Sequence, residues 1–379
     1  MKILMAGGGT GGHFYPLIAV ADQIREICKK EKLLEPQIYF MAPDPYNKKE
    51  LFDHEITFVP VMAGKSRISP SAGGRILNII DMFKMGIGVL TAIVKLYSIF
   101  PDVVFAKGGY TSFPALMAAK ILGIPVVIHE SDSVPGRVNA WAGKFAKRIA
   151  ISYKEAIEYF PADKTAHTGN PIRKEFSEPL SAGAVEYLNL ETSIPVILIL
   201  GGSQGAQIIN DAILSAIPSL VPKYQILHQT GKKNYEEVSR TANVILEGNK
   251  FISRYHPFDY FNTLAMRMAA GVSSLIISRG GSTIFEIAAW GIPSILIPIT
   301  TSNGDHQRKN SYNYARESSA IVIEEANLSP EIILNEIDRV MSNQHLSEKM
   351  RTGAKSFARL DSATLIANEI LKIALKHEM

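Results

Sequence analysis

Three glycine-rich turns carry residues that could bind phosphate. They occupy residues 7–12, 201–205 and 280–283, and each follows an apolar run typical of a β-strand. Glycine lets the main chain approach an anion closely, and the first N–H groups of a helix lack internal partners and lie at its positive end. Each turn could therefore hold a phosphate without a metal ion. Because the turns are split between the two halves of the chain, they favour two nucleotide-binding domains facing each other across a cleft.

His13, directly after the first turn, is a candidate proton acceptor. A histidine at the mouth of a cleft can take up a proton near neutral pH, as a general base must. The spacing fits equally well a histidine that only caps or packs at the start of a helix.

Glu286 lies one helical turn after Ser282 of the third turn, close to where a phosphate would bind. A carboxylate there can accept hydrogen bonds from both hydroxyls of a ribose. The alternative is an acidic residue that only complements the helix dipole, but the glycine turn and the flanking apolar residues favour the ribose. Gln307 belongs to a polar cluster, residues 304–310, that follows an apolar run. Ligands of open parallel sheets bind beyond the carboxyl ends of the strands.

A dinucleotide-binding fold is a competing interpretation, because Gly7, Gly9 and Gly12 match the pattern G-x-G-x-x-G. That fold requires an acidic residue about 20 residues further on, which binds the ribose. Asp44 lies 32 residues after Gly12, which is late, although it does follow a strand-like run. The spacing weakens this alternative without removing it.

The sequence offers little for a metal ion. It has no D-x-D pair of aspartates, and none of the nine histidines is paired at the short spacings of a zinc site. The diphosphate of a sugar nucleotide would then be neutralised by helix ends and by cations such as Arg173. These observations favour a transfer reaction that needs no metal.

Short strand-like runs alternate with longer helical patterns, which predicts an α/β protein with parallel sheets and helices on both faces. Besides the run before the first turn, the expected strands span residues 38–41, 103–106, 126–129, 148–152, 194–200, 225–228, 275–277, 295–298 and 320–323. The two halves also share a quasi-repeat. Residues 107–109 lead through a helical stretch to Gly-Ile-Pro at 123–125, and residues 279–281 lead likewise to Gly-Ile-Pro at 291–293. In both, glycine is expected to end a helix and proline to enter the next strand.

Composition and charge narrow the class of protein. The 379 residues suffice for two domains of roughly 100 to 200 residues each. The net charge of +4 arises from 40 basic and 36 acidic residues, a balance that argues against a nucleic-acid-binding protein. Cys28 is the only cysteine, which excludes an internal disulfide framework and fits the cytosol. The first strand begins at Lys2, so no secretory signal segment is expected.

Residues 64–100 combine many apolar residues with five basic residues and one acidic residue. That composition is typical of a helix that lies on an anionic membrane surface. It is equally typical of a core helix with a solvated basic edge, and the sequence leaves both interpretations open. Lys84 and Lys95 interrupt the run, and no run reaches the ~20 apolar residues of a membrane span. The sequence therefore predicts a soluble or peripheral protein.

Together, these motifs resemble those of the bacterial glycosyltransferase family 28 enzymes that transfer N-acetylglucosamine and make lipid II for peptidoglycan. The resemblance covers nearly the whole chain. It rests on residues 8–13, 108–110, 129–130, 169–173 and 201–205, the helix that carries Glu286, and residues 305–307, which occur in the family's order.

The resemblance implies a GT-B architecture, in which two Rossmann-like parallel-sheet domains face each other across a cleft. Residues 1–168 would bind the acceptor and the membrane, with a C-terminal helix at 362–379 packing back on them, and residues 169–361 would bind the UDP-sugar. It also implies an inverting hexosyltransferase. In that reaction the 4-hydroxyl of the N-acetylmuramyl unit of lipid I attacks the anomeric carbon of N-acetylglucosamine, UDP leaves, lipid II forms, and His13 is the base.

The resemblance further implies a role for individual residues. Arg173 and Ser203 would contact the diphosphate, the main chain at Ile252 the uracil, Glu286 the ribose and Gln307 the sugar. The implied donor-binding residues are Thr10, Gly11, Gly12, Arg173, Ser203, Ile252, Ser282, Thr283, Glu286 and Gln307, and those near the acceptor or sugar are Tyr110, Glu130, Asp132 and Asn139. The pair Ser131-Asp132 replaces the Gln-Asn of some members, and Arg308 replaces a second glutamine, so sugar contacts there stay open.

The implied partners are UDP-N-acetylglucosamine, the undecaprenyl-diphosphate-linked acceptor lipid I and an anionic membrane surface, with no nucleic acid. The protein is expected at the cytoplasmic face of the cell membrane, as a peripheral enzyme of cell-wall synthesis. No cofactor is expected to be required, and a divalent metal would at most stimulate. The alternatives are another UDP-sugar GT-B transferase or epimerase, a nicotinamide-dependent oxidoreductase that uses Asp44, and a sugar-nucleotide sensor without catalysis.

Overall fold

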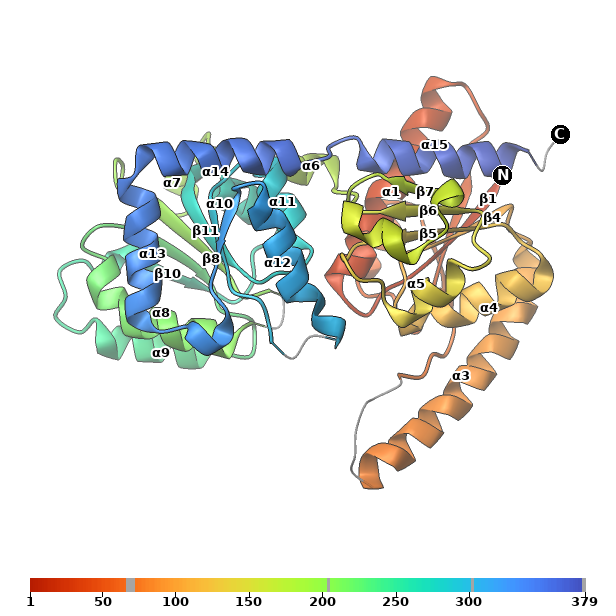
Figure 1. The fold of residues 1–379 in the computed structure, drawn as a ribbon, viewed down its shortest axis with the longest axis horizontal. Coiled ribbons are helices and arrows are strands. Elements are labelled where there is room, and N and C mark those ends of the chain that lie inside the picture. Colours follow the sequence, from red (N-terminus) through yellow and green to blue (C-terminus); the bar gives the residue numbers. More distant parts are fainter. Residues whose placement is uncertain (66–71, 203–204, 301–302, 377–379) are drawn as a thin grey trace. The chain divides into compact units, whose positions relative to one another are not determined.

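The computed structural model describes residues 1–65, 72–202, 205–300 and 303–376, and its chain divides into two compact units (Figure 1). Unit 1 comprises Met1–Arg173 and Arg359–Met379, and unit 2 comprises Lys174–Ala358. The first boundary therefore follows Arg173 rather than residue 168. Residues 169–173 stay with unit 1 because the Ser362 hydroxyl donates to the carbonyl oxygen of Gly169 at 2.8 Å, and Arg173 pairs with Glu50.

Unit 1 is built on a seven-stranded parallel sheet in the order β3-β2-β1-β4-β5-β6-β7. Its strands are β1 (Lys2–Ala6), β2 (Gln37–Ala42), β3 (Thr57–Pro60), β4 (Val103–Ala106), β5 (Val126–Glu130), β6 (Arg148–Ile151) and β7 (Thr165–His167). In β1, Ile3 and Met5 contribute to one core while Leu4 and Ala6 contribute to another. The inner strands are apolar on both faces because helices cover both sides of the sheet.

The helices of unit 1 are α1 (Gly11–Lys30), α2 (Lys48–Asp53), α3 (Ala72–Ile99), α4 (Phe113–Leu122), α5 (Arg137–Ala142) and α15 (Ser362–Leu375), with short 3-10 turns η1 (Tyr110–Ser112), η2 (Lys154–Tyr159) and η3 (Ala162–Lys164). Helices α1 and α15 share one core, which contains Ile18, Ile24, Ile366 and Ile370, and α3, α4 and α5 share the core on the other face. The last helix of the chain thus completes the core of the first unit.

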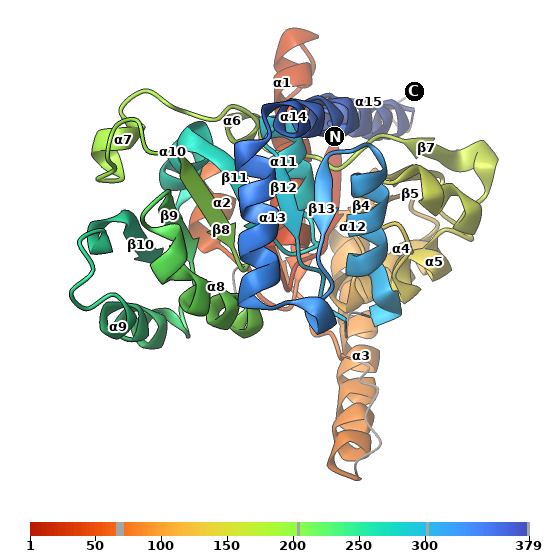
Figure 2. The same cartoon turned by 60° about the vertical axis from the view of Figure 1, so that its left-hand side comes forward.

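Unit 2 has a six-stranded parallel sheet in the order β10-β9-β8-β11-β12-β13. Its strands are β8 (Val196–Leu200), β9 (Gln225–Gln229), β10 (Tyr255–Phe258), β11 (Ser273–Ser278), β12 (Ser294–Leu296) and β13 (Ala320–Val322). Its helices are α6 (Lys174–Ser177), α7 (Ala184–Tyr187), α8 (Gln207–Leu220), α9 (Tyr235–Ile245), α10 (Thr263–Val272), α11 (Thr283–Trp290), α12 (His306–Arg316), α13 (Pro330–Ser342) and α14 (Gln344–Phe357). Its 3-10 turns are η4 (Ile252–Arg254), η5 (Asn303–Asp305) and η6 (Glu325–Asn327). Helices α8 and α13 lie side by side against the sheet (Figure 2).

Both sheets reverse their strand order once. The chain steps outward from β1 to β2 and β3 and then returns to the other side of β1 with β4, and unit 2 repeats this pattern around β8 and β11. The predicted α/β architecture of two Rossmann-like parallel sheets is confirmed. The quasi-repeat is confirmed as β4-α4-β5 and β11-α11-β12, because Gly123 and Gly291 end the two helices in the left-handed conformation, with φ of 69° and 64°.

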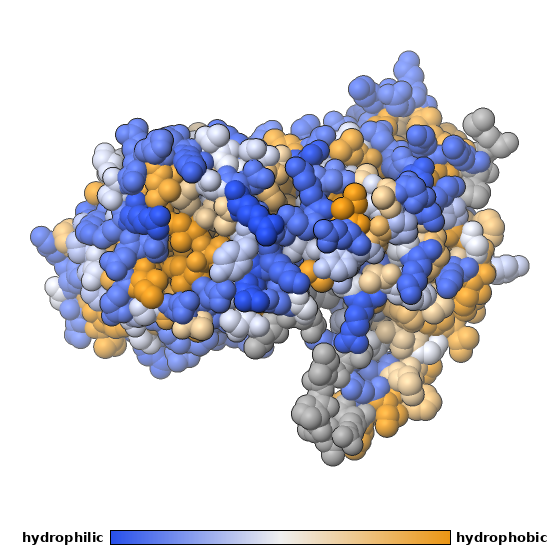
Figure 3. Space-filling view, viewed as in Figure 1, coloured by the Kyte–Doolittle hydropathy of each residue, from blue (hydrophilic) through white to orange (hydrophobic). Residues whose placement is uncertain are grey.

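Helix α3 exposes much of its apolar surface. Its segment Ile76–Ile99 has a mean hydropathy of 1.7 and is long and apolar enough to cross a membrane, by length and composition only. Exposed apolar side chains include Ile76, Phe83, Leu90, Val94 and Tyr97. Near the carboxyl end, Ala92 and Leu96 pack in the core. In Figures 1 and 2 the amino-terminal half of α3 extends beyond α4 and α5, and Figure 3 shows hydrophobic residues on the visible face of α3.

One interpretation of this segment needs correction. Only 11% of the apolar window is buried, so the interpretation of α3 as a core helix does not hold for most of its length.

Candidate active site

Two glycine turns meet at the carboxyl edge of the sheet in unit 1. Gly8 and Gly9 have φ of 114° and 81°, and Gly108 and Gly109 have φ of 89° and 77°, conformations that strain any residue with a side chain. Thr111 joins the two turns by donating from Oγ1 to the carbonyl oxygen of Gly8 at 3.4 Å. The turns follow β1 and β4, so they flank the point where the strand order reverses, which is where ligands of such sheets bind.

His13 lies between these two turns. It is in the first turn of α1, where its main-chain N–H donates to the carbonyl oxygen of Thr10 at 3.2 Å and its Nδ1 lies 3.2 Å from the Thr10 hydroxyl. A side-chain carbon at Gly109 would lie 3.6 Å from Cε1 of His13, so the turn at residues 108–109 passes close to the ring. Tyr110, the next residue, is 37% exposed. The fold thus brings together the predicted residues Thr10, Gly11, Gly12, His13 and Tyr110.

A buried cluster centred on Lys107 lies beside the turns, and its role was not predicted from the sequence. Lys107 is 1% exposed, and its Nζ lies 2.6 Å from Nδ1 of His129 and donates to Oδ1 of Asn170 at 2.8 Å. Nε2 of His129 lies 2.9 Å from the carbonyl oxygen of Gly169, which can only accept, so we place the ring proton on Nε2 and let Nδ1 accept from the lysine. The sequence signal that could have revealed this cluster is a lysine directly before Gly-Gly at the end of an apolar run.

Burial determines the charge states in this cluster. It lowers the pKa of His129 well below the ordinary 6.5, and the neighbouring positive charge of Lys107 lowers it further. Burial also lowers the pKa of Lys107 to about 7, against the opposing effect of Glu130. His129 is therefore a neutral group with both ring nitrogens engaged, rather than a proton acceptor for a substrate.

Glu130 organises the loop that follows β5. Its carboxylate accepts from the main-chain N–H groups of Asp132 at 2.9 Å and Gly136 at 3.1 Å, and from Nδ2 of Asn139 at 2.9 Å. Burial raises the pKa of Glu130 to about 7, and the nearby charge of Asp132 raises it as well. A side chain at Gly108 would lie only 2.6 Å from Nδ2 of Asn139, so this loop packs directly against the turn at residues 108–109. The structure therefore places the predicted acceptor-side residues around one pair of turns.

Arg173, the last residue of unit 1 before the boundary, lies beside the start of α1. Its Nη1 is 3.2 Å from Oε1 of Glu50, and its Cζ is 4.2 Å from the ring centre of Tyr15. Tyr15 borders the first glycine turn, because a side-chain carbon at Gly11 would lie 3.3 Å from its ring. The predicted diphosphate-binding cation is thus close to the first turn.

The second and third glycine turns flank the corresponding point in unit 2. Gly202 and Gly205 have φ of 84° and 77°. The Ser278 hydroxyl donates to the carbonyl oxygen of Leu200 at 3.3 Å and so joins the ends of β11 and β8. A side chain at Gly280 would collide with the main chain of Gln307, which explains the glycine there. Ser203, a predicted diphosphate contact, lies outside the described residues.

Four predicted donor-binding residues lie at the carboxyl edge of this sheet. Ser282 precedes α11 as its N-cap residue, Thr283 begins the helix, and Glu286 is in its first turn. Gln307 is in the first turn of α12, and its Oε1 accepts from the main-chain N–H of Ile299 at 3.1 Å. The fold of unit 2 therefore groups the two hydroxyl residues of the third turn, the predicted ribose-binding carboxylate and the predicted sugar-binding amide.

Ile252 lies apart from this group. It belongs to η4, which directly precedes β10, and β10 runs parallel to β9 and through it to β8. Ile252 is therefore at the amino edge of the sheet, whereas the glycine turns are at the carboxyl edge, contrary to the expected contact with uracil. The segment after β10 reaches the carboxyl edge instead. There Gln229 accepts from the main-chain N–H of Phe261 at 3.1 Å and donates to the carbonyl oxygen of Gly202 at 3.3 Å.

A second buried polar chain supports the second glycine turn. Nδ1 of His228 lies 2.8 Å from the Tyr255 hydroxyl, its Nε2 lies 3.1 Å from Oδ1 of Asn210, and Nδ2 of Asn210 donates to the carbonyl oxygen of Thr230 at 3.2 Å. Burial lowers the pKa of His228 to about 3, so the ring is neutral. Gly205 packs on the carbonyl of Thr230, where a side chain would collide. One histidine inside an apolar strand gave no sequence signal for this chain.

Asp44, on which the dinucleotide alternative depends, follows the carboxyl end of β2. Because β2 neighbours β1, the position fits that of a ribose-binding acid in dinucleotide-binding folds. Its Oδ1 accepts from the main-chain N–H of Tyr46 at 2.9 Å and so closes a turn of its own chain. The local geometry leaves this alternative open.

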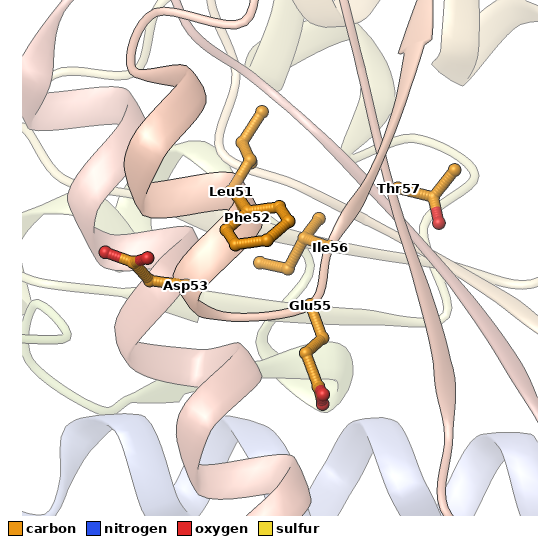
Figure 4. Close-up of a pocket in the computed structure, with 6 residues that line it drawn as sticks. All are labelled: Leu51, Phe52, Asp53, Glu55, Ile56 and Thr57. Atoms are coloured by element: carbon orange, nitrogen blue, oxygen red, sulfur yellow. The ribbon is translucent and has the colours of Figure 1, made fainter.

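A hollow of about 630 Å³ lies elsewhere in unit 1, at the turn between α2 and β3 (Figure 4). It is lined by Leu51, Phe52, Asp53, Glu55, Ile56 and Thr57. Thr57 begins β3, so the hollow is at the amino edge of the sheet, opposite the glycine turns. Among the residues that the structure describes, no group of three or more His, Cys, Asp or Glu side chains could hold a metal ion.

Comparisons of sequence identify related proteins along nearly the whole chain. The model of the glycosyltransferase family 28 N-terminal domain matches residues 3–151, and that of the family 28 C-terminal domain matches residues 196–365. The UDP-N-acetylglucosamine--N-acetylmuramyl-(pentapeptide) pyrophosphoryl-undecaprenol N-acetylglucosamine transferase of Borrelia turicatae is 34% identical, over 98% of this chain and 96% of the relative. The enzyme of the same name from Bacillus licheniformis is 32% identical, over 100% of this chain and 99% of the relative.

Solved structures agree with this fold. The crystal structure of Acinetobacter baumannii MurG has a TM-score of 0.72 at 25% identity and covers 98% of this chain and 99% of its own. The UDP-GlcNAc 2-epimerase of Neisseria meningitidis, bound to UDP-GlcNAc, has a TM-score of 0.67 at 17% identity and covers 98% of this chain and 100% of its own. At that identity the second likeness concerns the fold alone.

Proposed function

The chain belongs to glycosyltransferase family 28, and from this premise we propose that it transfers N-acetylglucosamine from UDP-N-acetylglucosamine to N-acetylmuramyl-(pentapeptide) pyrophosphoryl-undecaprenol. The product is the lipid II used to build peptidoglycan. The observation that carries this proposal is identity above 30% to transferases of that name over nearly the full length of both chains. Those matches also favour a transferase over the dinucleotide alternative.

Unit 2 is the proposed donor-binding unit. The third glycine turn would hold a phosphate with Ser282, Thr283 and the first N–H groups of α11, and Glu286 would accept from the ribose hydroxyls. Gln307, which reaches the same edge, would contact the sugar. Helix ends and Arg173 supply positive charge for the diphosphate, so the reaction is proposed to need no bound cofactor.

Unit 1 is the proposed acceptor-binding unit, with His13 as the general base. The acceptor's 4-hydroxyl gives its proton to His13 and attacks the anomeric carbon from the face opposite the diphosphate. The bond from that carbon to the UDP oxygen breaks, and the configuration inverts. His13 is suited to this role because its ring lies between the Thr10 hydroxyl of the first glycine turn and the main chain at Gly109.

Helix α3 is the proposed membrane contact, because the acceptor is anchored by an undecaprenyl chain. Its exposed apolar residues, which include Phe83, Leu90 and Val94, would enter the acyl region while Lys84 faces anionic headgroups. The protein would thus be peripheral, at the cytoplasmic face of the membrane, where a sugar nucleotide is available.

The decisive experiment measures UDP release from UDP-N-acetylglucosamine with and without a lipid I analogue. We expect release that depends on the acceptor, with a disaccharide product detected by mass spectrometry. Release without acceptor, together with an altered sugar, would instead identify an epimerase. Binding without any release would identify a sugar-nucleotide sensor.

A further inference from the structure

Four side chains of unit 1 form a chain of contacts that ends at Arg173. Nδ1 of His54 lies 2.6 Å from Oδ1 of Asp22, and Nε2 of His54 lies 3.3 Å from Oε2 of Glu50. The other carboxylate oxygen of Glu50, Oε1, lies 3.2 Å from Nη1 of Arg173. Asp22 is on α1, Glu50 is on α2 and His54 directly follows α2. The chain therefore ties two helices to the segment that leaves unit 1.

His54 is positively charged in this arrangement. Both ring nitrogens face a carboxylate, and a neutral imidazole has only one N–H to donate. The hydrogen bonds to Asp22 and Glu50, in that order, raise the pKa of His54 to about 9. The hydrogen bond from His54, and more weakly the charge of Arg173, hold the pKa of Glu50 below its ordinary value. Glu50 is thus an anion held between an imidazolium and a guanidinium.

The guanidinium group of Arg173 is contacted on its flat face as well as along its edge. Its Cζ lies 4.2 Å from the ring centre of Tyr15, the fifth residue of α1. The ring of Tyr15 and the hydroxyl of Tyr46 border Gly11, the first residue of that helix. A planar guanidinium that is paired along one edge and stacked on one face has few orientations left.

We propose that Glu50 is a positioning residue, which with His54 and Asp22 behind it holds the Arg173 guanidinium at the start of α1 to meet the diphosphate of the sugar nucleotide. This inference rests on the proposed function. A cation fixed before the ligand arrives does not have to be ordered during binding. It is also in place when negative charge grows on the departing UDP. In this role Glu50 acts only through Arg173.

The test compares variants by their affinity for UDP, measured by titration calorimetry on the whole protein. Glu50→Gln keeps the size of the side chain and removes its charge. The matched control is Glu55→Gln, because Glu55 pairs with Arg25 and its carboxylate points away from Leu51 and Phe52 (Figure 4). Arg173→Met and the double variant Glu50→Gln/Arg173→Met complete a double-mutant cycle.

We expect Glu50→Gln to raise the Kd of UDP by about 5- to 10-fold and Glu55→Gln to leave it within about twofold. Arg173→Met should weaken binding at least as much as Glu50→Gln, and the double variant no further. The inference would be overturned if Glu50→Gln lowered the affinity for UDP by the same factor with and without Arg173. An unchanged Kd in a folded Glu50→Gln protein would overturn it as well.

A second variant guards against a Glu50→Gln protein that fails to fold. Asp22→Asn removes the outer carboxylate without touching Arg173, and it should shift the Kd in the same direction by a smaller factor. An unchanged Kd in that variant, if Glu50→Gln does not fold, would overturn the inference. Failure of the proposed function has a different signature, because the unmodified protein would then bind UDP without transferring sugar to the lipid I analogue.

Discussion

Two histidines beside the same glycine turns differ in what they can do. His129 is fully buried, its two ring nitrogens contact Lys107 and the carbonyl of Gly169, and its pKa lies well below the ordinary value. It is a fixed, neutral part of the scaffold. His13 is only half-buried, its Nδ1 lies 3.2 Å from the Thr10 hydroxyl, and the main chain at Gly109 passes close to its ring. We therefore propose His13, rather than His129, as the residue that takes the proton of the substrate hydroxyl.

Replacing His13 with alanine should lower turnover by roughly 10² to 10⁴-fold, because that is the usual contribution of a general base. Affinity for UDP-N-acetylglucosamine should change by less than about twofold, since His13 is proposed to act on the acceptor hydroxyl rather than to hold the donor. Steady-state UDP release and calorimetry measure the two effects. His345→Ala, an exposed histidine of α14, serves as the control, and near-normal turnover in His13→Ala would remove His13 from the mechanism.

Replacing Glu286 with alanine should weaken donor binding by about 10- to 100-fold. The lost interaction is a charge-assisted contact with the ribose diol, worth roughly 1.5 to 3 kcal/mol. Glu331→Ala is the matched control, because Glu331 is likewise an acidic residue in the first turn of a helix, α13. If calorimetry gave the same donor affinity for Glu286→Ala as for Glu331→Ala, the ribose assignment would fail.

The ion pairs of His54 should make stability depend on pH. Its pKa is raised from 6.5 to about 9 in the folded protein, so its contribution is fully present below pH 6.5 and is lost as the pH rises through 9. His54→Gln should therefore destabilise unit 1 by on the order of 1 to 2 kcal/mol near pH 6 and by little near pH 10. Urea unfolding at both pH values measures this, and an equal destabilisation at both would contradict it.

Sequence could identify some of these residues and not others. The glycine turns, Glu286 and Gln307 could be proposed from the sequence because each is defined by neighbours within one turn or helix. Lys107 meets Asn170, and Glu50 meets Arg173, across 63 and 123 positions of the chain. Such contacts arise only when strands and helices are brought together, so spacing in the sequence does not reveal them.

Among the strands, those missed by the sequence lie at sheet edges, although a fourth edge strand, β13, was predicted at residues 320–323. Inner strands such as β4 and β8 are buried along their whole length and consist of apolar residues. The three unpredicted strands, β3, β7 and β10, are all edge strands, and most of their residues are partly exposed. An edge strand packs on one neighbour only, so it does not need the continuous apolar run that marks an inner strand.

Helix α3 yields a prediction about membrane binding. Changing the exposed residues Phe83, Leu90 and Val94 to serine should reduce binding to vesicles that contain anionic lipid by at least about 10-fold, because burying each such side chain is worth roughly 1.5 to 3 kcal/mol. Sedimentation with the vesicles measures this. Leu34→Ser, at an exposed residue that follows α1, is the control, and unchanged binding of the triple variant would exclude α3 as the contact.

At the scale of the whole molecule, the last helix belongs to the first unit. Ile370 of α15 is fully buried in the core that it shares with α1. Ile370→Ala should therefore destabilise unit 1 by about 2 to 5 kcal/mol and leave unit 2 unchanged. Each unit contains one tryptophan, Trp141 in α5 and Trp290 in α11, so fluorescence of single-tryptophan variants can follow the two units separately.

The matched variant is Ile337→Ala in the core of unit 2, which should destabilise unit 2 and leave unit 1 unchanged. If Ile370→Ala changed the transition reported by Trp290 as strongly as that reported by Trp141, the two units would not be independent in unfolding. The resemblance implied a helix at 362–379 that packs back on the first domain, and the core shared by α1 and α15 shows this packing.

The return of α15 also sets an order of events on the ribosome. The 185 residues of Lys174–Ala358 must be translated after Arg173 before the closing helix of unit 1 exists. At about 5 to 20 residues per second this interval lasts roughly 10 to 40 s. During it, the apolar side of α1 lacks its partner while α3 has already been synthesised. Unit 1 is the first to be translated and the last to be completed. The nascent chain therefore has time to meet a lipid surface, or a chaperone, before unit 1 has finished folding.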